Sequence, residues 1–329
     1  MQKRNWKRTC LRILTGAAAL IIIGGLVTRL RAARTFAAPY PQLHASSNPA
    51  VIERGRYLVD GPAHCAECHG AVEPAASSRL GRPLIGGQEI RLPVGTFRVP
   101  NITSDDETGI GRIKDEELSR MIRYGVKPDG RAALPFMPYT DLCDDDLVAI
   151  ISYLRTQPKV RHVVPEHDIN PLGRIVQAYL LEPKGPSSPP RKSCPPEATP
   201  AYGEYLTHNV GNCVMCHTKI DLRTGAFAGP PFGGGAEHEA LNHPDKKFVS
   251  PNLTPDPRWG WLQGWDEDAF VARFRAGRIH QDSPMPWEAF QRMTNNDLRA
   301  VYRYLHTLPA AQTGPDPLKR QVVLTAMNE

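Results

Sequence analysis

Two short motifs of cysteine and histidine are the residues most able to carry chemistry in this 329-residue chain. The first runs from Cys65 to His69 as Cys-Ala-Glu-Cys-His, and the second from Cys213 to His217 as Cys-Val-Met-Cys-His. Cys-x-x-Cys-His is the attachment signature of a c-type haem, whose vinyl groups take the two thiols while the histidine ligates the iron. The sequence predicts two covalently bound haem c groups, attached through Cys65, Cys68, Cys213 and Cys216, with His69 and His217 as iron ligands.

Two other kinds of site also use closely spaced cysteines. A zinc site would need two further Cys or His ligands at metal spacing in each half of the chain, and the sequence does not supply them convincingly. A thioredoxin-type redox pair needs no histidine at this place and accompanies a βαβ pattern, which the sequence lacks. Haem attachment is the interpretation that uses both cysteines and the histidine of each motif.

Methionine is a common second axial ligand of haem iron in cytochromes c. Met137 follows His69 by 68 residues and Met285 follows His217 by the same interval, each in a proline-flanked loop. Methionine is often only a gap-filler in a hydrophobic core, but the identical spacing predicts that both ligate iron. His/Met ligation favours electron transfer over substrate chemistry, and no catalytic acid–base pair or nucleophile is evident.

Further matched residues surround the motifs. Pro83 and Pro231, each fourteen residues after its histidine, are expected to shape the chain whose carbonyl orients the histidine ring. Asn101 and Asn252 are expected to hydrogen-bond a haem propionate or the methionine side. Turn geometry alone is the alternative for all four residues. His64, directly before the first motif, is expected in solvent.

The chain contains an internal duplication. Gly55 precedes the first motif by ten residues, and Gly203 precedes the second by ten. The Pro-Asn-Ile-Thr segment at 100–103 recurs as Pro-Asn-Leu-Thr at 251–254. Self-similarity at a fixed spacing indicates copies of one structural unit, so the sequence predicts two tandem domains.

Helical periodicity dominates both copies. Apolar residues recur at helical spacing over 144–155 and 295–307. Shorter helices are predicted over 115–124 and 266–276, stopped by Gly125 and Gly277, and another precedes each cysteine motif. Because no convincing run of alternating strand residues is present, the predicted class is all-α.

Between the copies, residues 163–196 hold eight prolines, which do not sustain a helix or a central strand. One apolar run, 175–181, fits a helical turn packed on a domain. The expected organisation is an anchor or signal at 1–34, domains at 45–162 and 197–312, the Pro-rich linker at 163–196 and a tail at 313–329.

Residues 1–34 carry eight Lys or Arg and no acid, and 11–30 gives twenty residues that can cross a bilayer if the flanking arginines snorkel. Five basic residues precede the apolar stretch and three follow it, which keeps the N-terminus cytoplasmic. A cleaved secretory signal is the alternative. Beyond residue 34, 32 basic residues face 34 acidic ones, so the net charge of +6 does not indicate a nucleic-acid partner. We expect a single-pass protein of the cell inner membrane with soluble domains in the periplasm.

Cys143 and Cys194 lie outside the motifs. In an oxidising compartment they either form a disulfide from the first domain to the linker or remain two free, small hydrophobic residues. Spacing alone does not distinguish these alternatives.

Residues 50–312 resemble class I cytochrome c domains, with Cys-x-x-Cys-His near an N-terminal helix, a methionine loop and a closing helix. More narrowly, 100–103 together with Tyr-Gly-Val-Lys-Pro-Asp-Gly at 124–130 and Met-Pro-Tyr at 137–139 is similar to cytochrome c subunits of membrane-bound bacterial dehydrogenases. The resemblance implies two tandem cytochrome c domains after an N-terminal transmembrane helix. The second copy departs from it at 256–261, and many of the similar subunits carry three haems.

A dihaem cytochrome of this kind would take electrons from an exported dehydrogenase subunit. It would pass them to the respiratory chain, with quinone or a terminal oxidase as acceptor, and would turn over no substrate itself. The main alternative is a dihaem peroxidase-type enzyme with one displaceable axial ligand. A third possibility, a haem-based sensor, lacks an output segment other than the short tail.

Overall fold

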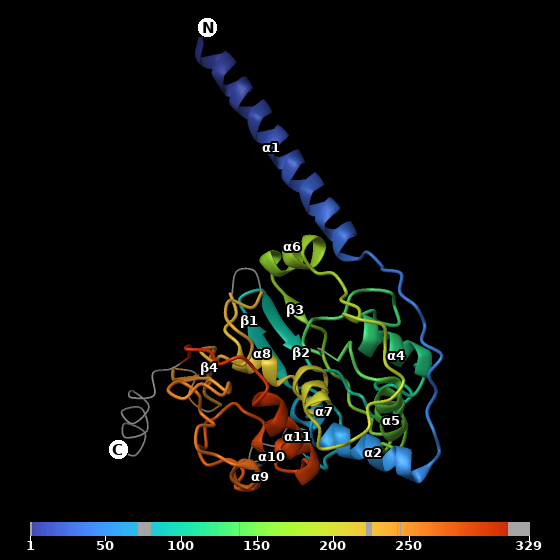
Figure 1. Ribbon diagram of the computed structural model, residues 1–329. Helices are drawn as coiled ribbons and strands as arrows, with labels where there is room; N and C mark the ends of the chain where they lie inside the picture. Colours follow the sequence, from blue (N-terminus) through green and yellow to red (C-terminus); the bar gives the residue numbers. More distant parts are fainter. Residues whose placement is uncertain are drawn as a thin grey trace.

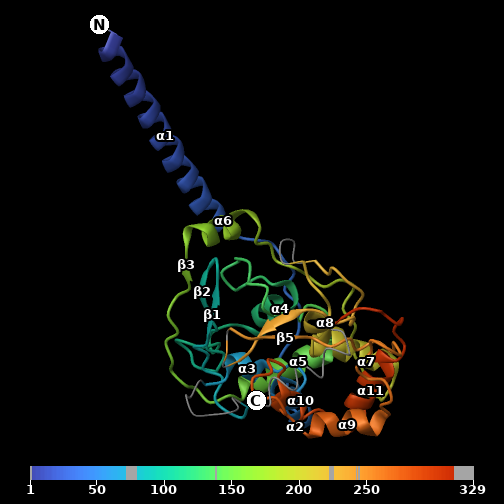
Figure 2. The same ribbon diagram turned by 90° about the vertical axis from the view of Figure 1, so that its left-hand side faces the viewer.

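A long N-terminal helix, α1 (Gln2–Ala32), stands away from the rest of the chain in the computed structural model (Figures 1 and 2). The structure describes residues 2–71, 80–137, 139–221, 226–241, 243 and 245–314. Within α1, the segment Arg8–Ala32 is long and apolar enough to cross a membrane, and its most apolar stretch is not buried against other parts of the chain. These features are consistent with the predicted anchor. Most of the predicted tail lies outside the described residues.

The first repeat is built from helices α2 (Pro49–Asp60), α3 (Cys65–His69), α4 (Asp115–Tyr124) and α5 (Asp144–Arg155). Both α4 and α5 match the predicted ranges, and Gly125 ends α4 in the left-handed conformation that its sequence position predicted. Three aspartates open α5, where the positive end of the helix dipole favours them. Leu58, Leu147 and Ile151 form part of the fully buried core between α2 and α5.

The second repeat has the same order of main elements. Its helices are α7 (Pro200–Tyr205), α8 (Cys213–His217), α9 (Glu267–Arg275), the short α10 (Trp287–Phe290) and α11 (Asn295–Leu305). A π-helical turn, Leu206–Val210, extends α7 toward α8. The predicted helices at 266–276 and 295–307 correspond to α9 and α11, which are shorter by one or two residues at their ends.

Two glycines allow the helices of each repeat to cross closely. A Cβ added to Gly55 on α2 would stand 1.9 Å from the carbonyl oxygen of Ala149 on α5. A Cβ added to Gly203 on α7 would stand 2.0 Å from the carbonyl oxygen of Ala300 on α11. The matched glycines of the duplication are therefore contact points between the first and last helix of each repeat.

Five short strands in the described part of the chain depart from the all-α prediction. Strands β1 (Glu89–Leu92), β2 (Gly95–Arg98) and β3 (Asp168–Ile169) form one antiparallel sheet, and β4 (Glu237–Glu239) pairs with β5 (Lys247–Val249). Each strand is at most four residues long, too short for alternation to stand out in the sequence. The fold is mostly helical, but the expectation that strands are absent is wrong.

The Pro-rich linker contains more structure than a single helical turn. After β3, helix α6 (Pro171–Tyr179) begins with Pro171 and is capped by the side chain of Asn170, which accepts from the Gly173 amide. Farther along, the backbone carbonyls of Arg191 and Lys192 accept hydrogen bonds from the first two amides of α5. The linker thus packs along the first repeat.

Near this contact, Cys143 and Cys194 are free cysteines whose side chains interact electrostatically with each other. The Cys143 side chain is buried, and Cys194 packs against the same hydrophobic core. Of the two alternatives drawn from the sequence, the structure has the free pair.

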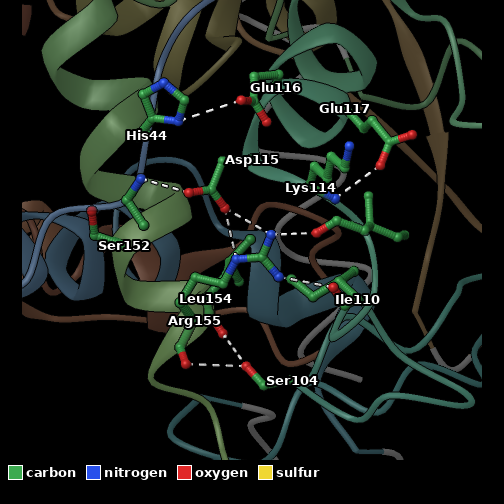
Figure 3. Close-up of polar contacts among 12 residues, drawn as sticks. His44, Ser104, Ile110, Lys114, Asp115, Glu116, Glu117, Ser152, Leu154 and Arg155 are labelled. Carbon is green, nitrogen blue, oxygen red and sulfur yellow. Dashed lines mark hydrogen bonds and ion pairs between the residues drawn. The ribbon is translucent and has the colours of Figure 1, made fainter.

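A polar cluster closes the first repeat around the C-terminal end of α5 (Figure 3). Arg155 pairs with Asp115 of α4 at 2.7 Å and donates to the carbonyl of Ile110. The Ser104 hydroxyl donates to the carbonyls of Leu154 and Arg155 in the last turn of the helix, where carbonyl groups need partners from outside it. These contacts fix the loop between residues 101 and 113 against α5.

The two repeats meet through a reciprocal pair of buried tyrosine–aspartate hydrogen bonds. Tyr57 of the first repeat donates to Asp297 of the second at 2.5 Å, and Tyr205 of the second donates to Asp146 of the first at 2.8 Å. Arg54 binds Asp146 through two nitrogens and also donates to the Tyr202 hydroxyl. Because buried carboxylates need such partners, these bonds fix how the repeats sit on each other.

We predict that Gly55→Ala and Gly203→Ala each lower the free energy of unfolding by about 3 kcal/mol, because backbone atoms block the added methyl group. Urea unfolding followed by circular dichroism measures the change. Gly229→Ala is the matched control, since its Cβ would find only an ordinary contact at 3.6 Å. Equal stability of all three variants would contradict the close helix crossing.

Candidate functional site

Each cysteine–histidine motif forms a single helical turn, α3 or α8. The residue before each turn has a left-handed backbone, with φ of 40° at His64 and 50° at Asn212. This conformation is uncommon outside glycine but is more accessible to Asn and His than to most residues. The first cysteine of each motif is partly buried and the second is exposed. At a spacing of three residues, both lie on the same side of the turn, as attachment to one macrocycle requires.

Both motif histidines are buried and bonded in the same way. Nδ1 of His69 donates to the carbonyl oxygen of Pro100 at 2.9 Å, and Nδ1 of His217 donates to the carbonyl oxygen of Pro251 at 3.2 Å. Since a carbonyl only accepts, Nδ1 carries the proton and Nε2 is left with its lone pair. This arrangement orients a histidine for metal ligation.

Burial also sets the charge state of these rings. It lowers the pKa of His69, and it lowers the pKa of His217 to about 4, because desolvation opposes the imidazolium form. The neutral imidazole that results at neutral pH is the form that binds a metal ion.

The carbonyl that holds each ring is itself held by a buried asparagine. Asn101 donates to Val160 O at 2.9 Å and to the Thr108 hydroxyl at 3.1 Å, and its Oδ1 accepts from the amide and hydroxyl of Thr103. These four hydrogen bonds use both N–H groups and the oxygen of the Asn101 side-chain amide. The expectation that it binds a propionate or the methionine is wrong, and the turn alternative holds.

Asn252 repeats this arrangement in the second half. It donates to the carbonyls of Ala311 and Thr313 and accepts from the amide and hydroxyl of Thr254. In both repeats, then, the asparagine ties the loop that carries the proline carbonyl to the chain that follows the last helix.

The segments after Pro83 and Pro231 bond to the backbone of the motif histidines and pack against the loop that carries the proline carbonyl. Gly86 donates its amide to His69 O, and Gly234 donates its amide to His217 O, each at 2.8 Å. Both glycines have φ of 70°, and a Cβ on Gly86 would stand 2.4 Å from the Pro100 oxygen. Pro83 and Pro231 thus lie in chain that shapes the carbonyl-bearing loop, as their spacing predicted.

The two predicted methionine ligands occupy equivalent surroundings. Met137 and Met285 are partly buried and pack against the hydrophobic core, as do Cys65 and Cys213. Next to Met137 in sequence, Pro138 lies outside the described residues. Iron ligation by both methionines stays a prediction.

His64 is not in solvent, contrary to its prediction from the sequence. Its ring packs edge-on against Phe290 of the second repeat, with 5.6 Å between ring centroids, and it lies close to the backbone of Gly211. Burial lowers the pKa of His64. A Cβ on Gly211 would stand 3.5 Å from the carbonyl oxygen of Pro62. The peptides leading into the two motifs therefore lie against each other, which no local sequence pattern indicated.

The residues present fit covalently attached haem. Each repeat supplies two thiols on one turn and a neutral imidazole with an open Nε2, and the carbonyl-bound tautomer leaves no other use for that nitrogen in the described contacts. In the described part of the chain, no three His, Cys, Asp or Glu side chains gather as metal ligands.

Comparison with known proteins agrees with this arrangement. The chain is similar to cytochrome c subunits of dehydrogenases. It is 30% identical to the alcohol dehydrogenase (quinone) cytochrome c subunit of Gluconobacter oxydans over 82% of its length. It is 28% identical to the gluconate 2-dehydrogenase cytochrome c subunit of Pantoea cypripedii over 80% of its length.

A second kind of relative is closer in size. The chain is 28% identical to a dihaem cytochrome c-type protein of Cereibacter sphaeroides, over 92% of this chain and 99% of that protein. By contrast, it spans only 57% of the Gluconobacter subunit and 61% of the Pantoea subunit. No family model matches the chain.

We predict that Asn101→Ala lowers the free energy of unfolding by about 2–4 kcal/mol, because buried groups lose their partners. Thermal unfolding of the purified chain measures the effect. Asn296→Ala, at an exposed position on α11, is the control and should leave the midpoint unchanged. Stability of Asn101→Ala equal to that of the control would rule out a role for the asparagine in holding the loop.

Proposed function

We propose that this chain is a membrane-anchored dihaem cytochrome c that transfers electrons from an exported dehydrogenase to the respiratory chain. The observation that carries the proposal is the duplicated site, in which a buried histidine within Cys-x-x-Cys-His donates Nδ1 to a proline carbonyl. A cofactor of this kind supplies one-electron redox chemistry when bound, and the protein supplies binding and orientation.

The roles of the site residues follow from their positions. Four cysteines would attach the two haems through thioether bonds, and the two histidines would ligate iron through Nε2. Met137 and Met285 would each supply a further ligand to one of the two irons. The full set is Cys65, Cys68, His69 and Met137 for the first haem, and Cys213, Cys216, His217 and Met285 for the second.

The adjacent attachment peptides support electron transfer within the chain. His64 precedes the first motif and contacts Phe290 and Gly211 of the second repeat. Because these peptides carry the cysteines, the two haems would lie on neighbouring parts of the interface. Electrons would then pass between them without a separate protein.

Helix α1 and the similar proteins support the proposed membrane location and the proposed electron donor. Helix α1 would hold the chain in the cell inner membrane, with the repeats in the periplasm, since more basic residues precede its apolar stretch than follow it. Relatives named as dehydrogenase cytochrome subunits make a dehydrogenase the proposed donor. Quinone or a terminal oxidase is the proposed acceptor.

Covalent attachment has a direct test. Expressed in a host that matures c-type cytochromes, the intact chain should have the mass of the polypeptide plus two haems. Replacing Cys65 and Cys68 by serine should remove one haem, and replacing Cys213 and Cys216 should remove the other. Cys10→Ser is the control and should keep both. A mass equal to the bare polypeptide would overturn the proposal.

The methionine assignment predicts separate effects at the two haems. Met137→Ala and Met285→Ala should each lower the potential of one haem and let its reduced iron bind carbon monoxide, because an axial position opens. Optical redox titration and carbon monoxide difference spectra measure both. Met121→Leu, on α4, is the control. If carbon monoxide binds one haem of the unsubstituted protein, that iron lacks a tight sixth ligand and the peroxidase-type alternative gains support.

A further inference from the structure

Helix α6 of the linker lies against the end of α1 that faces the repeats (Figures 1 and 2). The Tyr179 hydroxyl is 3.4 Å from the Thr28 hydroxyl, and the Arg31 guanidinium lies 4.9 Å from the centre of the Tyr179 ring. Arg34 donates to the carbonyl of Leu181 at 3.0 Å. These contacts join two segments that are about 150 residues apart in the sequence.

On its other side, α6 is fixed to the first repeat. The Asn170 side chain donates to Pro93 O at 2.8 Å, at the turn between β1 and β2. A Cβ on Gly173 would stand 2.0 Å from the Val94 oxygen, so the helix backbone rests directly on that turn. Ala178 is fully buried. The helix is therefore held rigidly between α1 and the sheet.

An apolar face of α6 remains exposed. Leu172, Ile175, Tyr179 and Leu180 have 55%, 49%, 44% and 73% of their surface exposed. At 100° per residue these four positions fall within an arc of about 140° on one side of the helix. Isolated exposed apolar residues are ordinary, but a contiguous apolar face marks an interaction surface.

The position of α6 identifies what covers this face. A span beginning at Leu11 crosses about 30 Å of hydrocarbon in twenty residues and ends near Leu30. Tyr179 contacts Thr28 and Arg31, on either side of this level. Tyrosine is enriched where membrane and water meet. The apolar face therefore lies where a bilayer surface begins.

Charge around the helix fits the same partner. Arg29 and Arg31 lie in the last turn of α1, and Arg174 is exposed on α6. Amphipathic helices with basic residues beside an apolar face lie in the plane of the bilayer boundary and bind phospholipid headgroups.

We propose that α6 is an interfacial helix that inserts Leu172, Ile175 and Leu180 into the bilayer boundary beside α1. The inference rests on the proposed function of α1 as a membrane anchor. It gives the chain two attachments to the membrane instead of one. Since α6 is fixed to the sheet of the first repeat, the repeats would have a set orientation, with α2 and α9 at the end far from the membrane (Figures 1 and 2).

Lipid photolabelling tests this directly. The full-length haem-loaded protein is placed in nanodiscs of phosphatidylcholine that include a lipid with a diazirine on its acyl chain. After irradiation, digestion and mass spectrometry, we expect label on α1 and on residues 171–181. Peptides holding Leu241 and Ile279, which are exposed elsewhere on the chain, should stay unlabelled.

A triple variant, Leu172→Gln, Ile175→Gln and Leu180→Gln, should reduce labelling of residues 171–181 at least tenfold and leave labelling of α1 unchanged. Glutamine keeps helix propensity, and Tyr179 keeps its contact with α1. The control carries Leu241→Gln and Ile279→Gln and should label like the unsubstituted protein.

The outcomes separate the two claims. Label on α1 but not on residues 171–181 of the unsubstituted protein would overturn the inference, keep the anchor and leave the face for a protein partner. Absence of label from both would overturn the anchor as well.

Discussion

The hydrogen bond from a buried histidine ring to a proline carbonyl is the contact on which each half of this protein depends. It fixes the tautomer and the direction of Nε2 in a place from which water is excluded. The carbonyl is in turn positioned by a four-bonded asparagine and by a glycine that no larger residue can replace without a clash. The proline, asparagine and glycine residues that recur in both repeats therefore act together to position the imidazole ring of the motif histidine.

Features that depend on neighbouring residues could be read from the sequence. The bounds of α4 and α5 follow from apolar periodicity, acidic first turns and, for α4, a stopping glycine. The motif histidines and the proline-bearing segments were found because a second copy marks which residues are kept at fixed spacing. The long apolar helix α1 was equally visible, since length and composition alone define a candidate membrane span.

Features that depend on contacts between residues far apart in the chain could not be predicted from the sequence. For Asn101 the sequence left a cofactor contact and turn geometry as alternatives, because a repeated spacing does not show whether a side chain faces a ligand or its own loop. His64 was placed in solvent because its partner, Phe290, is more than two hundred residues away. The strands of two to four residues were not predicted, because pairing with a neighbouring strand, rather than an alternating sequence pattern, stabilises them.

The interface between the repeats keeps the two cysteine–histidine sites in a constant relation. Apolar surfaces can slide, whereas buried carboxylates tolerate only positions in which their partners remain bonded. Tyr57 and Tyr205 each supply such a partner to the opposite repeat, and Arg54 neutralises Asp146. Displacing one repeat would take Tyr57 from Asp297 and Tyr205 from Asp146, at a cost of about 1–3 kcal/mol for each lost hydrogen bond. The tyrosine–aspartate hydrogen bonds therefore set the relative orientation of the two repeats, while the surrounding hydrophobic core supplies most of the stabilisation.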